Sequence, residues 1–188
     1  SAHFQAFTYT GTGVGNRSIT LNGNSNLQPD LYWYKGRNSN HHYWVDSSRG
    51  TTKYLYSSLA NAEGTVAIAY VRSFDTNGVT LGDGDSGTNT NGISFANWVW
   101  KANGGTGGRT AFTESGANPG GGYQPNTTAG FSIVKYTGSG TDNDSIGHSL
   151  GVAPEMIIIK KYTQTDNWMV FHHNLTSGSE LKLSLPGA

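Results

Sequence analysis

Short runs of aromatic and β-branched residues recur along this chain roughly every eight to twelve residues, and Gly, Asn or Ser bounds most of them. Runs of this composition are typical of β-strands, and the bounding residues are typical of the turns between strands. The stretch 57–63 alone has some helical character. It lacks a sustained helical period, so we interpret it as a turn or a single helical turn. The pattern therefore predicts an all-β protein.

The predicted strands cover most of the chain. In chain order they are 4–10, 31–35, 43–46, 52–56, 65–74, 79–81, 93–101, 131–137, 155–162, 168–172 and 181–185. Both faces of 31–35 are apolar, which predicts a strand buried between two layers. The pairs Asn77-Gly78 and Asn91-Gly92 each precede a strand, where the glycine can take the positive φ of a tight turn.

Composition and charge exclude several classes of protein. Twelve basic and twelve acidic side chains balance across 188 residues, so the chain lacks the basic surface that a nucleic-acid partner requires. No apolar run approaches the ~18 residues of a membrane span, and no signal peptide is visible. The chain contains no Cys, which excludes a disulfide framework and zinc sites built from cysteine.

The chain also contains an internal repeat. Residues 4–13 match 131–140, with Phe, Tyr, Thr and two Gly identical in place. Residues 29–35 then match 154–160, and Tyr43–Asp46 matches roughly Met169–His172. An ordered series of matches is hard to explain by composition alone.

The repeat predicts two structural units. We expect a first β-sandwich unit over 1–103, a Gly/Pro/Asn-rich linker over 104–129, and a partial second unit over 130–188. A partial sandwich exposes apolar strand faces and open strand edges. The first unit, a neighbouring subunit or further chain is therefore expected to cover it.

Residues 131–140 followed by 146–160 resemble a repeat of phage structural proteins, the tail-fibre and virion-appendage proteins of cyanophages and other marine phages. The first unit is similar to another stretch of the same family at 29–35, 46–55, 73–82 and 98–102. The resemblance implies an antiparallel β-sandwich of the jelly-roll or concanavalin-like kind in an extended virion protein. It implies no catalytic residues.

We therefore expect a non-enzymatic virion structural protein, found on the virion or outside the cell, that acts by assembly and host-surface adhesion. The family resemblance implies a homo-oligomer, with a trimer as the expectation because virion fibres are commonly trimeric. Other virion proteins and a host-surface glycan are the further partners expected. The alternatives are a secreted lectin-like carbohydrate-binding module and, less favoured, the non-catalytic fragment of a glycan depolymerase.

One loop offers a candidate glycan site, because binding residues usually lie on loops at the end of a sandwich. It combines two imidazoles, two aromatic rings, an amide and a guanidinium, supplied by Arg37, Asn40, His41, His42, Tyr43 and Trp44. The simpler interpretation is a polar hairpin in which Tyr43 and Trp44 enter the core.

A second loop offers a candidate calcium site. Asp83, Asp85 and Asn89 have the spacing of a calcium loop among glycines, but the distal bidentate Glu is missing. A solvated hairpin loop explains these residues more simply. We expect no other cofactor and no catalytic residue.

The remaining candidates are aromatic. Trp98 and Trp100 are two residues apart and share a strand face, so they could stack on sugar rings, although packing in the core between sheets is the favoured interpretation. Trp33 is predicted in the same core. The rings of His172 and His173 are predicted to point to opposite faces of a strand, which would prevent them from chelating one metal.

Overall fold

A computed structural model of the protein describes residues 1–38, 41–67, 70–82, 87–102, 110–112, 120–176 and 179–183. These residues form β-strands and no helix, so the prediction of an all-β protein is confirmed. Among the described segments there is therefore no helix that is long and apolar enough to cross a membrane. In chain order the strands are β1 (Phe4–Thr10), β2 (Ser18–Thr20), β3 (Leu31–Gly36), β4 (His42–Asp46), β5 (Lys53–Tyr56), β6 (Gly64–Thr65), β7 (Val71–Asp75), β8 (Gly78–Leu81), β9 (Ser94–Trp100), β10 (Thr110–Phe112), β11 (Gly121–Asn126), β12 (Phe131–Tyr136), β13 (Met156–Ile159), β14 (Met169–His172) and β15 (Leu181–Lys182).

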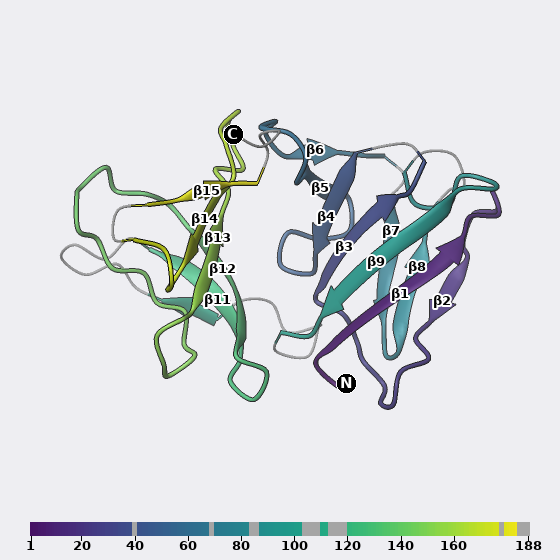
Figure 1. Ribbon diagram of the computed structural model, residues 1–188, viewed down its shortest axis with the longest axis horizontal. Helices are drawn as coiled ribbons and strands as arrows, with labels where there is room; N and C mark the ends of the chain where they lie inside the picture. Colours follow the sequence, from purple (N-terminus) through teal and green to yellow (C-terminus); the bar gives the residue numbers. More distant parts are fainter. Residues whose placement is uncertain are drawn as a thin grey trace.

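The first half of the chain, from β1 to β9, is an antiparallel β-sandwich (Figure 1). One sheet has six strands in the order β1-β9-β3-β4-β5-β6, and the other has three in the order β2-β8-β7. β3 is hydrogen-bonded to β9 on one side and to β4 on the other. Its first two residues, Leu31 and Tyr32, point to opposite faces and are both buried, as expected for a central strand.

Alternate residues of the two sheets build the interior of this sandwich. In β9, Phe95, Asn97 and Val99 are buried, whereas Trp98 and Trp100 lie on the other face of the sheet. The rings of Tyr34 and Tyr43 stack in parallel with their centroids 5.0 Å apart. The buried core cluster consists of Leu21, Leu27, Tyr32, Tyr34, Tyr43, Val45, Val71, Val79, Leu81, Phe95 and Val99.

Two core tyrosines should respond differently to loss of the hydroxyl group. Tyr32 Oη donates to Asn97 Oδ1 at 2.6 Å, whereas the buried Tyr34 Oη has no hydrogen-bond partner among the described residues. Tyr32→Phe should therefore lower the free energy of unfolding by about 1–3 kcal/mol, because a buried amide oxygen loses its donor. Tyr34→Phe should leave it unchanged or raise it, because the variant removes a desolvated, unpaired hydroxyl. Equal losses for the two variants in urea unfolding would contradict this difference.

The second half contains two three-stranded antiparallel sheets, β10-β11-β12 and β13-β14-β15. Because β10 and β11 fall within 104–129, the prediction of a linker over that whole segment is wrong. The sequence pattern does not predict β11 as a strand, because four of its six residues are Gly, Pro or Asn, which are depleted in strands. Pro125 is tolerated because it faces Ser132 at a pairing position that needs no N–H donor.

Strand pairing corresponds between the predicted units for three strands of each. β13-β14-β15 has the same order as β3-β4-β5. Leu31 pairs with Asp46, and their counterparts Met156 and His172 pair in the same way. The match extends to the third strand and the adjoining turns. Trp44 pairs with Leu55 as Val170 pairs with Leu181, and Ser47 N donates to Asp30 O at 2.8 Å as His173 N donates to Glu155 O at 2.8 Å.

The first strands of the two units differ in their partners. β1 pairs with β9, whereas its sequence counterpart β12 pairs with β11. Pro29 and Pro154 stand just before β3 and β13, as the repeat predicts, since a strand can begin after a residue without an N–H donor. The equivalence between the units therefore holds in detail for β3–β5 and β13–β15.

All five tryptophans gather on the face of the six-stranded sheet that points away from the sandwich interior. We call Trp33, Trp44, Trp98, Trp100 and Trp168 the tryptophan cluster. The ring centroid of Trp33 lies 5.5, 5.6 and 6.4 Å from those of Trp44, Trp98 and Trp100. Trp44 contacts Trp168 of the second half, with centroids 5.2 Å apart.

The tryptophan cluster joins the two halves of the chain. The indole N–H of the buried Trp168 donates to the Tyr56 carbonyl at 2.8 Å, and Trp100 lies 6.1 Å from the ring of Phe131. The prediction that Trp33, Trp98 and Trp100 pack in the core between the sheets is therefore wrong. They are half-buried on the opposite face, because a strand apolar on both sides can serve two packing layers.

A buried ionic network fixes the turn after β4. Arg49 Nε contacts Asp46 Oδ2 at 2.6 Å and Arg49 Nη1 contacts Glu63 Oε2 at 3.0 Å. The side chains of Arg49 and Asp46 are only 8% and 4% exposed. Asp46 Oδ1 also accepts hydrogen bonds from Ser48 Oγ and from the backbone N–H of Arg49. The charges are thus neutralised within the protein, which holds β4 against the segment that carries Glu63.

Candidate functional site

The second half presents apolar side chains that have buried counterparts in the first half. The exposed fractions are 43% for Ile157 and 36% for Phe171, whereas their counterparts Tyr32 and Val45 are fully buried. Ile157, Phe171, Ile159 and Met169 occupy the four register positions that face the sandwich interior in the first half. We call these four residues the uncovered face. Met156 and Leu181, which point to the other face of the same sheet, are each 56% exposed.

The uncovered face results from the absence of a covering sheet. In the first half, β2-β8-β7 supplies Val71, Val79 and Leu81 against the counterpart face. Among the described residues of the second half there is no counterpart of that sheet, and Ser145-Ile146, which match Ser18-Ile19 of β2, are not in a strand. Apolar patches of this kind on a folded surface mark sites of association.

The structure separates the residues of the predicted glycan loop. Arg37 and His41 are exposed and His42 is half-buried, while Asn40 lies outside the described residues. Tyr43 is only 6% exposed within the core and Trp44 belongs to the tryptophan cluster. The predicted set of six ligand contacts is therefore wrong at Tyr43. The hairpin interpretation is correct for Tyr43, whereas Trp44 packs on the other face of the same strand.

The two histidines of this loop lie against β5 and the segment that follows it. The ring of His41 contacts that of Tyr56, with centroids 4.6 Å apart, and the backbone N–H of His42 donates to Ser58 Oγ at 3.2 Å. Burial lowers the pKa of His42 below its ordinary value of 6.5, and the positive charges of Lys35 and His41 lower it further. A folded chain with neutral His42 is therefore favoured.

Protonation of His42 should destabilise the protein in mild acid. Below pH 6.5 the unfolded chain binds a proton at His42, while the folded chain, with its lowered pKa, resists it. The free energy of unfolding should therefore fall as the pH drops from 6.5 through the folded pKa, and His42→Gln should remove that part of the fall. Urea unfolding at several pH values measures it, with His173→Gln, an exposed histidine, as the control. Identical pH profiles for wild type and His42→Gln would contradict the expectation.

The structure gives Asn89 a role in the fold rather than in calcium binding. Asp83 and Asp85 lie outside the described residues. Asn89 is fully buried, and its Oδ1 accepts hydrogen bonds from Thr12 N and from Arg17 Nη1, each at 3.0 Å. A guanidinium at this oxygen opposes a second cation, so the prediction of Asn89 as a calcium ligand is wrong. In the part of the chain that the structure describes, no three His, Asp or Glu residues form a metal-binding group.

The His172–His173 pair also differs from its prediction. His172 ends β14 and His173 follows it in a turn, so strand alternation no longer applies. Their rings lie together with centroids 4.6 Å apart, rather than on opposite faces.

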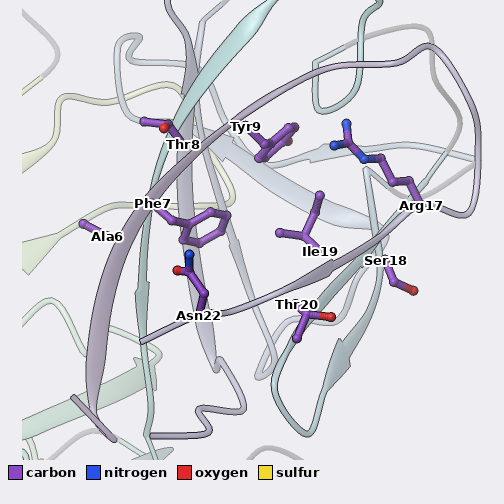
Figure 2. Close-up of a pocket in the computed structure, with 9 residues that line it drawn as sticks. All are labelled: Ala6, Phe7, Thr8, Tyr9, Arg17, Ser18, Ile19, Thr20 and Asn22. Atoms are coloured by element: carbon purple, nitrogen blue, oxygen red, sulfur yellow. The ribbon is translucent and has the colours of Figure 1, made fainter. Parts of the chain in front are cut away.

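A groove that sequence reasoning missed lies at the open edge of the sandwich, between β1 and the segment that contains β2 (Figure 2). Its residues are Ala6, Phe7, Thr8, Tyr9, Arg17, Ser18, Ile19, Thr20 and Asn22. The rings of Phe7 and Tyr9 stack with centroids 6.3 Å apart, and the Arg17 guanidinium lies 5.2 Å from the Tyr9 centroid. The groove thus combines half-buried aromatic rings with a cation and, at its rim, hydroxyl and amide groups.

Burial and hydrogen bonding fix the two central residues of this groove. Burial strongly raises the pKa of Tyr9, and the hydrogen bond with Tyr32 and the positive charge of Arg17 offset only part of that effect, so Tyr9 is a neutral phenol. Its hydroxyl donates to the Thr88 carbonyl. Arg17 Nη1 donates to the Thr10 carbonyl at 2.6 Å, while its Nε and Nη2 have no hydrogen-bond partner among the described residues. These two donors are thus available to a ligand.

The chain belongs to a family defined as a domain of unknown function, DUF7483, whose model matches residues 1–188. No curated protein matches the chain, and no solved structure matches it.

Proposed function

We propose that this domain is a non-enzymatic structural component of a virion fibre or appendage. It works on the virion or outside the cell by assembling with copies of itself, as an expected trimer, and with other virion proteins, and by adhering to the host surface. The uncovered face is the observation that carries this proposal, because its four counterparts in the first half, Tyr32, Tyr34, Tyr43 and Val45, are buried. The resemblance of residues 131–160 to phage fibre repeats supports the virion setting.

Assembly through the uncovered face is tested by light scattering on the 188-residue chain at micromolar concentration. Wild type should associate, and the double variant Ile157→Ser/Phe171→Ser should be monomeric, because it removes the apolar groups that association would bury. Val152→Ser is the matched control, since Val152 is 69% exposed but lies outside the uncovered face. A monomeric wild type, or a double variant that associates as wild type does, would count against the proposal.

The groove at the open sandwich edge favours a second candidate function, that of a lectin-like carbohydrate-binding module. Phe7 and Tyr9 offer apolar ring surface on which a sugar ring can stack, and Arg17 offers two hydrogen-bond donors beside them. This combination of an apolar wall and a few polar groups is typical of small-ligand sites.

A glycan array followed by titration of any hit tests this second candidate. Phe7→Ala should abolish binding, because Phe7 lies in the groove. Phe4→Ala should leave binding unchanged, although Phe4 is an aromatic residue of the same strand, because it is not among the groove residues. Equal loss in both variants, or no hit on the array, would speak against carbohydrate binding in the groove.

A further inference from the structure

We infer that the second half binds an extended β-strand of another polypeptide between β12 and β13, in the position that β9 occupies between β1 and β3. This inference rests on the proposed role in assembly and names the kind of partner. In the first half, β9 pairs with β1 along seven residues and with β3 along six, antiparallel to both. In the second half, no described strand lies between the counterparts β12 and β13.

Hydrogen-bond alternation shows which edge of β12 is open. Gly11 N donates to Ile93 O and Lys101 N donates to His3 O, so the odd-numbered residues of β1, Phe7 and Tyr9 among them, bond to β9. Their repeat counterparts in β12 are Val134 and Tyr136.

These counterparts do not bond to β11. Thr137 N donates to Gly120 O, which assigns Phe131, Ile133 and Lys135 to the pairing with β11. Ser132, Val134 and Tyr136 therefore direct their N–H and C=O groups to the other edge, and these groups have no hydrogen-bond partner among the described residues. β11 is thus on the opposite side of β12 from the position of a β9 counterpart.

The same reasoning applies to β13. His173 N donates to Glu155 O, so Ile157 and Ile159 bond to β14. Met156 and Ile158 direct their backbone groups to the other edge of β13. At the corresponding edge of β3, their counterparts Leu31 and Trp33 bond to β9. No described residue bonds to the backbone groups of Met156 and Ile158. Both borders of the β9 position are consequently open.

The first half indicates which residue pattern a strand bound between β12 and β13 must have. β9 alternates Phe95, Asn97 and Val99 toward the sandwich interior with Trp98 and Trp100 on the other face. An occupant beside the uncovered face should likewise be extended, uncharged on its inward side and apolar at alternate positions. Its backbone would complete the two ladders, as in other cases of β-strand addition.

A peptide of residues 93–101, labelled with a fluorophore, is the probe, because this sequence fills the counterpart position in the first half. Its binding to the 188-residue chain is followed by fluorescence polarisation. Val134→Pro and Ile158→Pro should each weaken binding about tenfold, because each removes an N–H donor that faces the open edge and breaks no hydrogen bond present in the free chain. Thr8→Pro is the matched control, since Thr8 N–H faces the outer edge of β1. A peptide with Asn97→Pro should not bind.

Hydrogen exchange in the same experiment separates this inference from the proposed function. Bound peptide should protect the amides of Ser132, Val134, Tyr136, Met156 and Ile158. The inference fails if these amides are already protected in the peptide-free monomer, or if the peptide binds without protecting them. Protection by peptide with no self-association of the chain at any concentration would uphold the strand site and overturn assembly into a homo-oligomer.

Discussion

Phe95→Ala should lower the free energy of unfolding by about 3–5 kcal/mol, the range found when a large core side chain is truncated. Phe95 is fully buried in the middle of the sandwich and packs against Tyr9, with ring centroids 5.1 Å apart. The large effect is expected because β9 joins β1 to β3, so a cavity at Phe95 disturbs three strands together. Urea unfolding followed by tryptophan fluorescence measures it.

Phe4→Ala is the matched control for this prediction. Phe4 also belongs to the six-stranded sheet, but it is 39% exposed and lies on the face with the tryptophan cluster. Its truncation should cost much less than that of Phe95, because less apolar surface leaves contact with the protein. A loss for Phe4→Ala as large as that for Phe95→Ala would show that the sandwich interior is not the dominant core.

Arg49→Leu should also destabilise the protein by about 3–5 kcal/mol, because it leaves a buried carboxylate without its partner. The guanidinium touches Asp46 at 2.6 Å and Glu63 at 3.0 Å, and the side chain of Asp46 is 4% exposed. The triple variant Arg49→Leu/Asp46→Asn/Glu63→Gln should recover part of the loss, since it removes the unpaired charges. Thermal and urea unfolding of both variants measure the difference.

The exposed ion pair of Lys161 and Asp166 supplies the control. Its atoms are 2.9 Å apart, but the two side chains are 56% and 46% exposed, so Lys161→Leu should change stability little. A similar response of Arg49→Leu and Lys161→Leu would mean that burial does not set the value of the Arg49 network.

Strand positions were predictable from the sequence where both the strand and its turn carried clear signals. β1 begins and ends as expected, and the Asn77-Gly78 turn leads into β8 with Gly78 at a φ of 131°. The segment 65–74 was predicted as one strand, whereas the structure has β6 at its start and β7 near its end. β2 was missed because three residues, Ser18–Thr20, carry too little pattern.

The candidate sites were less predictable because they depend on contacts between distant segments. The pairing of Leu31 with Asp46 and of Met156 with His172 follows the repeat, so the uncovered face could be anticipated from the partial second unit. The groove could not, since it needs Arg17 brought over the ring of Tyr9. The period of a strand says which residues share a face, but not whether that face meets the other sheet or a second layer, which is why the tryptophans were misplaced.

Hydrogen exchange on the 188-residue chain, at a concentration low enough to keep it monomeric, tests the central claim. That claim is that the described residues of the second half repeat the sheet β3-β4-β5 without a counterpart of β9 beside it and without a counterpart of the sheet β2-β8-β7 over it. Amides of Leu31 and Trp33 should be protected, because β9 pairs with them, while those of their counterparts Met156 and Ile158 should exchange quickly. Ile157 should be protected by β14, which gives alternating rates along β13. Uniform protection along β13, equal to that along β3, would contradict the account.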